Sequence, residues 1–159
     1  MVRAGTVALL LLLAAGCSAG NDSPSEAPRD LRVERISSGA PGQGPEQSRI
    51  ILAPSAAALS EAIGANVPDS GEGTYLAAYW GEKSTGGYSL AVESARLEGE
   101  RVTVRLALKE PPRDAIVTQA LTYPYAVAVV RDLDPQGKDF SFTDQDGREL
   151  GWPVRLAGG

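Results

Sequence analysis

The stretch that decides the fold class is YSLAVESARLEGERVTVRLALK, residues 88–109. In its second half, residues 101–109, large apolar side chains recur at every second position, which is typical of a strand with one buried face. The first half alternates in the same way until Ser94, where a slip in the pattern predicts a β-bulge. Glu98-Gly99-Glu100 joins the two halves as a hairpin turn, so we expect two antiparallel strands here.

The segments on either side of this hairpin predict a strand and one helix. Pro111-Pro112 ends the hairpin, because proline cannot donate a ladder hydrogen bond. Upstream, the apolar run of residues 49–53 predicts a strand. Ser55 can then cap a helix over residues 56–63 that ends at Gly64.

The C-terminal part predicts further short strands. A strand or pair of strands is expected over residues 116–130, and residues 126–130 are apolar on both faces, as in a central strand. A last hairpin should begin near Phe140, turn at Asp146-Gly147 and close on residues 152–156. The 18 Gly and 11 Pro favour such short pieces. We therefore predict an α+β domain, a small antiparallel β-sheet with one early helix packed on it.

The N-terminus has the plan of a signal peptide over residues 1–16. Arg3 precedes an apolar run of residues 7–15, which is shorter than the roughly 20 residues that a membrane-spanning helix needs. The sequence Leu13-Ala14-Ala15-Gly16-Cys17 resembles the lipobox of bacterial lipoproteins. That resemblance implies lipid attachment at Cys17 and a location at the cell membrane, on its extracytoplasmic face. An ordinary secretory signal followed by a chance cysteine is the alternative.

The next segment reads as a spacer. Small residues, Pro, Gly and charged residues dominate residues 18–47, and such a composition buries too little apolar surface to offset the entropy of ordering. We therefore predict a lipidated cysteine and flexible linker over residues 17–47 and a folded domain over residues 48–159. Within the linker, residues 30–36 alternate enough for a short strand, which stays open as an alternative.

The composition excludes several classes of function. The chain has no His and a single Cys, which removes His-activated nucleophiles, His-ligated zinc and an internal disulfide. A formal net charge of −5 disfavours binding to nucleic acid. The Asp-Gly turns near Gly137 and Gly147 lack the ligand spacing of a calcium loop. We expect no catalytic residue, no metal and no cofactor, so the chain is not predicted to be an enzyme.

A family resemblance suggests a role. The sequence Gly81-Glu82-Lys83-Ser84-Thr85-Gly86-Gly87-Tyr88, the pair Pro111-Pro112, and Leu121-Thr122-Tyr123-Pro124-Tyr125 resemble the C-terminal domain of PrcB-like proteins over residues 76–130. The family takes its name from a lipoprotein subunit that supports the stability of an exported protease complex. The resemblance implies a non-catalytic subunit that binds and stabilises an exported partner, for which a protease is one candidate.

The candidate residues for partner binding combine the Thr-Gly-Gly-Tyr element with nearby aromatic residues. They are Thr85, Gly86, Gly87, Tyr88, Tyr79 and Trp80. Aromatic side chains supply much of the anchor energy at interfaces, but they can equally fill a small core, and the glycines can simply serve a turn with positive φ. Two other functions stay open, a small-molecule or cell-wall ligand binder and a protease-inhibitor-like module that uses residues 81–87.

Overall fold

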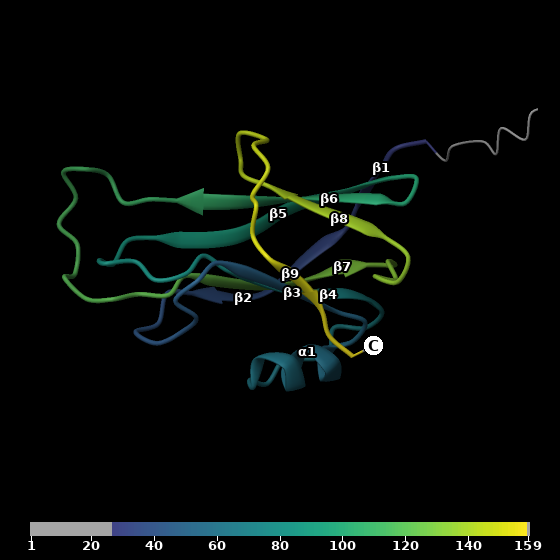
Figure 1. Cartoon of the computed structure of the whole chain (residues 1–159), viewed down its shortest axis with the longest axis horizontal. Helices are drawn as coiled ribbons and strands as arrows, with labels where there is room; N and C mark the ends of the chain where they lie inside the picture. The colour runs from purple at the N-terminus through teal and green to yellow at the C-terminus, as the bar shows by residue number, and fades with distance from the viewer. Residues whose placement is uncertain (1–26, 159) are drawn as a thin grey trace, which may run out of the picture.

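The computed structural model describes residues 27–158 and divides them into two sheets and one helix (Figure 1). The central sheet has the strand order β2-β7-β4-β3-β9, and the outer sheet has the order β1-β5-β6-β8. The helix is α1 (Ala56–Ile63). The outer-sheet strands are β1 (Arg29–Leu31), β5 (Ser89–Glu98), β6 (Arg101–Lys109) and β8 (Asp139–Thr143). The central-sheet strands are β2 (Val33–Gly39), β3 (Arg49–Ala53), β4 (Gly73–Tyr79), β7 (Tyr125–Arg131) and β9 (Val154–Leu156).

The predicted hairpin is confirmed as β5 and β6. Glu98 pairs with Arg101 across the turn, and the register shifts between Val92 and Ser94, next to the predicted slip. The side chains of Val102, Val104 and Leu106 are fully buried, as the period of two requires. This hairpin is the framework of the outer sheet.

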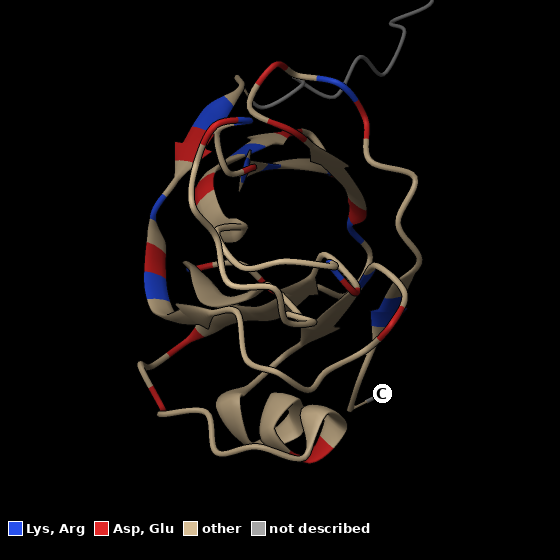
Figure 2. Cartoon of the chain, turned by 90° about the vertical axis from the view of Figure 1, so that its left-hand side faces the viewer, with Lys and Arg blue, Asp and Glu red and all other residues tan. Residues whose placement is uncertain are grey.

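The α+β class with one early helix is confirmed, but the single sheet that we expected is two. Strand β7 is central, as predicted, and lies between β2 and β4. Because β4 and β7 are buried along both faces, the central sheet needs a cover on each side. The outer sheet covers one face and α1 covers the other, which Figure 2 shows end-on.

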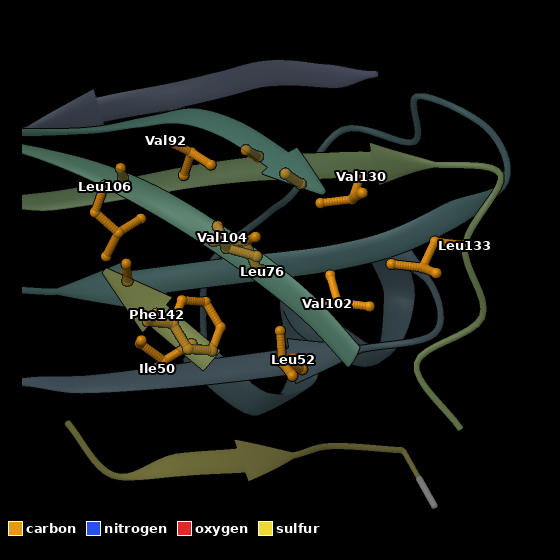
Figure 3. Close-up of a cluster of buried hydrophobic side chains, with 14 of the residues drawn as sticks. Ile50, Leu52, Leu76, Val92, Val102, Val104, Leu106, Val130, Leu133 and Phe142 are labelled. Atoms are coloured by element: carbon orange, nitrogen blue, oxygen red, sulfur yellow. The ribbon is translucent and has the colours of Figure 1, made fainter. Parts of the chain in front are cut away.

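The two covers give two cores. The larger core lies between the sheets and includes Ile50, Leu76, Leu106, Val130 and Phe142 (Figure 3). The smaller core lies between the central sheet and α1 and includes Leu59, Tyr75 and Val129.

The helix begins and ends at the predicted residues. The Ser55 hydroxyl accepts a hydrogen bond from the Ala58 N–H at 3.2 Å, and Gly64 ends the helix with φ 68°, as N-cap and C-cap residues do. Leu59 is fully buried beneath the central sheet. In residues 27–158, no helix is long and apolar enough to cross a membrane.

The predicted linker is wrong from Arg29 to Gly39. This segment supplies β1 to the edge of the outer sheet and β2 to the edge of the central sheet. Leu31 and Val33 pack against the core between the sheets, and the Arg131 guanidinium contacts the Glu34 carboxylate at 2.9 Å. An edge strand gains its ladder hydrogen bonds from its neighbour and can therefore form from a polar sequence. Cys17 and the signal segment lie outside the described residues.

The last predicted hairpin forms only around its turn, where Thr143 and Glu149 make an antiparallel bridge and the N–H of Leu150 donates to the Phe142 carbonyl at 2.7 Å; it does not close on residues 152–156. The turn at Asp146-Gly147 is present, but β8 pairs in parallel with β6 and β9 pairs in parallel with β3. The two strands thus belong to different sheets, and each sheet contains one parallel pair. Parallel pairs join segments far apart in sequence, so no local turn signal announces them.

Candidate functional site

Two long loops meet at one end of the molecule. Residues 80–88 join β4 to β5, and residues 110–124 join β6 to β7. We call residues 81–88 and 110–124 the apical loops, and Figure 1 shows the longer one projecting beyond the sheets on the left. The strand expected to start at Ile116 is wrong, because the chain stays in loop until Tyr125.

The apical loops are bonded to each other. The N–H of Lys83 donates to the Thr122 carbonyl at 2.8 Å, and the N–H of Thr122 donates back to the Lys83 carbonyl at 2.9 Å. The N–H of Gly86 donates to the Thr118 carbonyl at 2.9 Å. The Thr122 hydroxyl donates to the Thr85 carbonyl at 2.7 Å. The Thr-Gly-Gly-Tyr element therefore braces the longer loop.

The two glycines of this element have different roles. Gly87 has φ 89°, and a Cβ there would lie 2.8 Å from Pro111 Cβ, so a side chain would be both strained and crowded. Gly86 lies outside the left-handed region, and its Cβ would meet Thr118 at an ordinary 3.5 Å. The turn therefore requires glycine at Gly87 and not at Gly86.

Trp80 and Tyr88 form a closed cluster with Lys83. Their rings meet edge to face with centroids 5.5 Å apart, and Lys83 Nζ lies 4.5 Å from the Trp80 centroid and 5.6 Å from the Tyr88 centroid. Burial lowers the pKa of Lys83, and the nearby Glu110 partly opposes this shift. The Lys83 ammonium group thus occupies the face of the Trp80 ring. Trp80 also packs against the core between the sheets.

Tyr79 faces the opposite side of the central sheet. Successive strand residues point to opposite faces, so Tyr79 lies away from Trp80, beside Tyr125, with ring centroids 6.4 Å apart. The Arg49 guanidinium lies 5.5 Å from the Tyr79 ring centroid. The structure therefore places four of the six candidate residues in the apical loops and Trp80 directly before them, and it separates Tyr79 from this group.

Other tyrosines have structural partners. Tyr75 is buried under α1, and its hydroxyl donates to the Gly71 carbonyl at 2.8 Å. The Tyr123 hydroxyl donates to Glu82 Oε2 at 2.6 Å, which raises the pKa of Tyr123. This bond adds a further link between the two apical loops.

Sequence reasoning missed the most exposed apolar residue. Ile116 is fully solvent-exposed at 104%, and Leu121 is 50% exposed, both on the longer apical loop. The length of this loop was an available signal, because loops of about 15 residues without secondary structure are often functional. Ile116 therefore joins the candidate residues for partner binding.

The acidic turns have local structural partners. Asp144 Oδ1 accepts hydrogen bonds from the N–H groups of Asp146 and Arg148 at 2.9 and 2.8 Å, and Asp134 Oδ1 accepts one from the N–H of Gln136 at 2.9 Å. Such bonds are typical of Asx turns. Within residues 27–158, no group of three or more His, Cys, Asp or Glu side chains is placed to hold a metal ion.

Comparison with known proteins confirms the resemblance found in the sequence. Residues 74–131 match the family model described as PrcB C-terminal. The match runs from β4 to β7 and includes both apical loops, so this part of the chain is PrcB-like. No curated protein and no solved structure matches the chain.

Proposed function

We propose that this chain, PrcB-like over residues 74–131, is a lipid-anchored accessory protein that binds and stabilises an exported protein. A protease complex is the candidate partner that the family suggests. The chain carries no chemistry of its own in this role. Its folded part presents a docking surface, and Cys17 holds that surface at the extracytoplasmic face of the membrane.

The observation that carries this proposal is the fully exposed Ile116, on a loop that is bonded to the other apical loop at Thr118 and Thr122. Four backbone and side-chain hydrogen bonds fix the two apical loops together, so little conformational entropy remains to be lost when a partner binds. Burying an isoleucine side chain contributes about 1.5–3 kcal/mol. A rigid loop that offers such a side chain suits insertion into an apolar pocket of a partner protein.

The fold also changes the expected reach of the domain. The first strand begins at Arg29, so residues 18–28 alone connect the proposed lipid site to the fold. That segment spans at most about 40 Å when fully extended. Arg29 pairs with Leu97 beside the β5–β6 turn, at the end of the molecule opposite the apical loops (Figure 1), so the proposed partner surface would lie farther from the membrane than the end of this segment, by the length of the sheets.

The experiment is site-specific photocrosslinking in intact cells. A photoreactive amino acid replaces Ile116 in one strain and Glu100 in another, because the β5–β6 turn lies at the opposite end of the molecule (Figure 1). We expect the same exported protein to be captured from position 116 and not from position 100. Equal capture from both positions would contradict docking through the apical loops.

The anchor is tested in the same cells. Cys17→Ala should move the chain out of the membrane fraction without changing its thermal unfolding, because the two cores described in the structure are formed by residues between Leu31 and Ala157. If the variant stays with the membrane, the lipid tether is wrong.

An inhibitor-like role is the second candidate, and the same exposed loop favours it. Ile116, rather than residues 81–87, would then occupy the active site of a protease. With a captured protease in hand, the accessory role predicts that activity persists when the chain is bound. The inhibitor-like role predicts that activity is lost and that Ile116→Asp restores it.

A further inference from the structure

The helix covers only part of the central sheet. It packs on β3 and β4 and leaves a groove of about 530 Å³ over β7 and β2. This volume lies within the roughly 300–1,000 Å³ of small-molecule sites. The groove is separate from the apical docking surface, because its floor is the face of the sheet that Tyr79 and Val127 share. We call it the tyrosine groove.

One row of residues crosses the floor of the groove from strand to strand. Arg49 pairs with Tyr79, Tyr79 pairs with Tyr125, and Tyr125 pairs with Gly39. Paired residues of neighbouring strands point to the same face, so the guanidinium and the two phenol rings lie side by side. Gly39 gives the Tyr125 ring its room, because a Cβ there would lie 3.2 Å from the ring.

The polar ends of this row have no acceptors in the protein. Among residues 27–158, the Arg49 guanidinium and the hydroxyls of Tyr79 and Tyr125 take part in none of the hydrogen bonds or salt bridges between side chains and protein groups. Burial raises the pKa of Tyr79, with Arg49 acting in the opposite direction and Tyr125 adding to the rise. The Tyr79 phenol therefore stays protonated at neutral pH and remains a donor.

The charge of the groove is one-sided. Arg49 is the one charged residue in its lining, and no acidic residue lines it, although the chain carries 20 Asp and Glu and a net charge of −5. Three donors without an acidic neighbour match the acceptor oxygens of an anion.

The remaining lining is partly apolar and partly polar: Ser37, Gln43 and Asn66 are its polar side chains. Ile36, Ile63, Val67 and Val127 line the groove beside the tyrosines. The wall formed by residues 41–45 is fixed on Tyr123, whose N–H donates to the Pro41 carbonyl at 2.9 Å. Gly44 approaches Tyr123 so closely that a Cβ would lie 2.5 Å from Tyr123 Cβ. The groove is thus formed before any ligand arrives.

We propose that the tyrosine groove binds a single-chain alkyl carboxylate, with the carboxylate at Arg49, Tyr79 and Tyr125 and the chain along Ile36 and Val127. An alkyl chain suits this floor better than a peptide does. Strand β7 under the groove is paired on both sides, with β2 and with β4, so its backbone offers no partner to the amides of a bound peptide, and burying an amide without a partner is costly. An alkyl chain has no such groups.

Calorimetric titration with octanoate tests the site. The full chain carries Cys17→Ala so that it can be handled without detergent, and 1-octanol serves as the neutral probe of equal length. We expect octanoate to bind with one-to-one stoichiometry and at least about tenfold more tightly than octanol, because charge-assisted hydrogen bonds are made only with the acid.

Two variants locate the anion. Arg49→Gln should weaken octanoate binding about tenfold or more, and Tyr79→Phe about threefold. Arg105→Gln is the matched control, since it removes the same charge from an exposed position of β6 on the outer sheet. Unchanged thermal unfolding of all three variants would show that the groove itself is intact.

Three results would overturn the proposal. One is equal binding of octanoate and octanol, and another is equal loss of affinity in Arg49→Gln and Arg105→Gln. The third is tighter binding of a short peptide that ends in a leucine carboxylate, which would assign the groove to a protein C-terminus. Arg49, Tyr79 and Tyr125 lie outside the apical loops. A failure of the alkyl carboxylate proposal would therefore not contradict docking through those loops, which the photocrosslinking experiment tests separately.

Discussion

Replacing Gly87 by Ala should destabilise the protein, whereas the same change at its neighbour Gly86 should not. At Gly87 the new methyl group meets a φ of 89° and lies 2.8 Å from Pro111 Cβ and 3.2 Å from Val117 Cγ1. A residue forced into a sparsely populated conformation costs about 1–3 kcal/mol, and displacing the proline ring adds to that. At Gly86 the nearest contact is 3.5 Å, so Ala should fall within about 1 kcal/mol of the wild type.

Urea unfolding followed by tryptophan fluorescence measures the difference. With an m value of about 1–3 kcal/mol/M for a small protein, a loss of 2 kcal/mol lowers the midpoint by about 1 M. Because the loop can open locally, hydrogen exchange at the Gly86 and Thr122 amides is a second readout. Both amides donate between the apical loops and should lose protection in Gly87→Ala. Equal midpoints and equal protection in the two variants would refute the assignment of Gly87 as the required glycine.

Three further predictions concern the smaller core, the β2 edge of the central sheet and the tyrosine groove. Leu59→Ala, which empties a fully buried position under the central sheet, should cost about 2–5 kcal/mol in thermal unfolding, whereas the exposed Glu61→Ala should change stability by less than about 0.5 kcal/mol. Glu34→Gln removes the partly exposed ion pair with Arg131 and should cost about 1 kcal/mol or less; a cost that does not shrink in high salt would argue against an ionic origin. Burial raises the pKa of Tyr79 in the folded protein, so folding favours the neutral phenol. The stability gained in this way is fully present below the ordinary tyrosine pKa of about 10. It is lost as the pH rises through the raised pKa that Tyr79 has in the folded protein. Tyr79→Phe should therefore lose less stability than the wild type on going from about pH 9 to about pH 11, and identical losses would contradict this.

Local signals predicted the elements that are stabilised locally. The β5–β6 hairpin follows from a period of two and one turn, and the register shift next to Ser94 follows from a slip in that period. The helix follows from Ser55, Gly64 and the apolar spacing between them. In each case, the residues that determine the element are its own residues or their immediate neighbours.

Elements that depend on a distant partner were missed or misread. The polar segment of β2 is ordered because six of its residues pair with β7, almost a hundred positions away, and its composition alone predicts disorder. The segment that holds Ile116 contains enough apolar residues for a strand. It remains a loop because Pro111-Pro112 and Pro124 bound it and because its hydrogen bonds go to residues 83–86.

The candidate site shows the same division. The sequence located the Thr85–Tyr88 turn and its aromatic neighbours, but it could not show that Gly87 rather than Gly86 carries the positive φ. Strand alternation was an available signal that the side chains of Tyr79 and Trp80 point to opposite faces, but it does not say which residues each of them then contacts.

The sequence by itself determined the α+β class, the β5–β6 hairpin, the helix with its caps and the PrcB-like character of residues 74–131. Only the tertiary structure decided that there are two sheets, that residues 29–39 join both of them, and that Arg49, Tyr79 and Tyr125 share one groove. The physical reason is the range of the interactions. Periodicity and capping act over a few residues, whereas sheet order, parallel pairing and groove walls depend on contacts between segments that the chain brings together only when it folds.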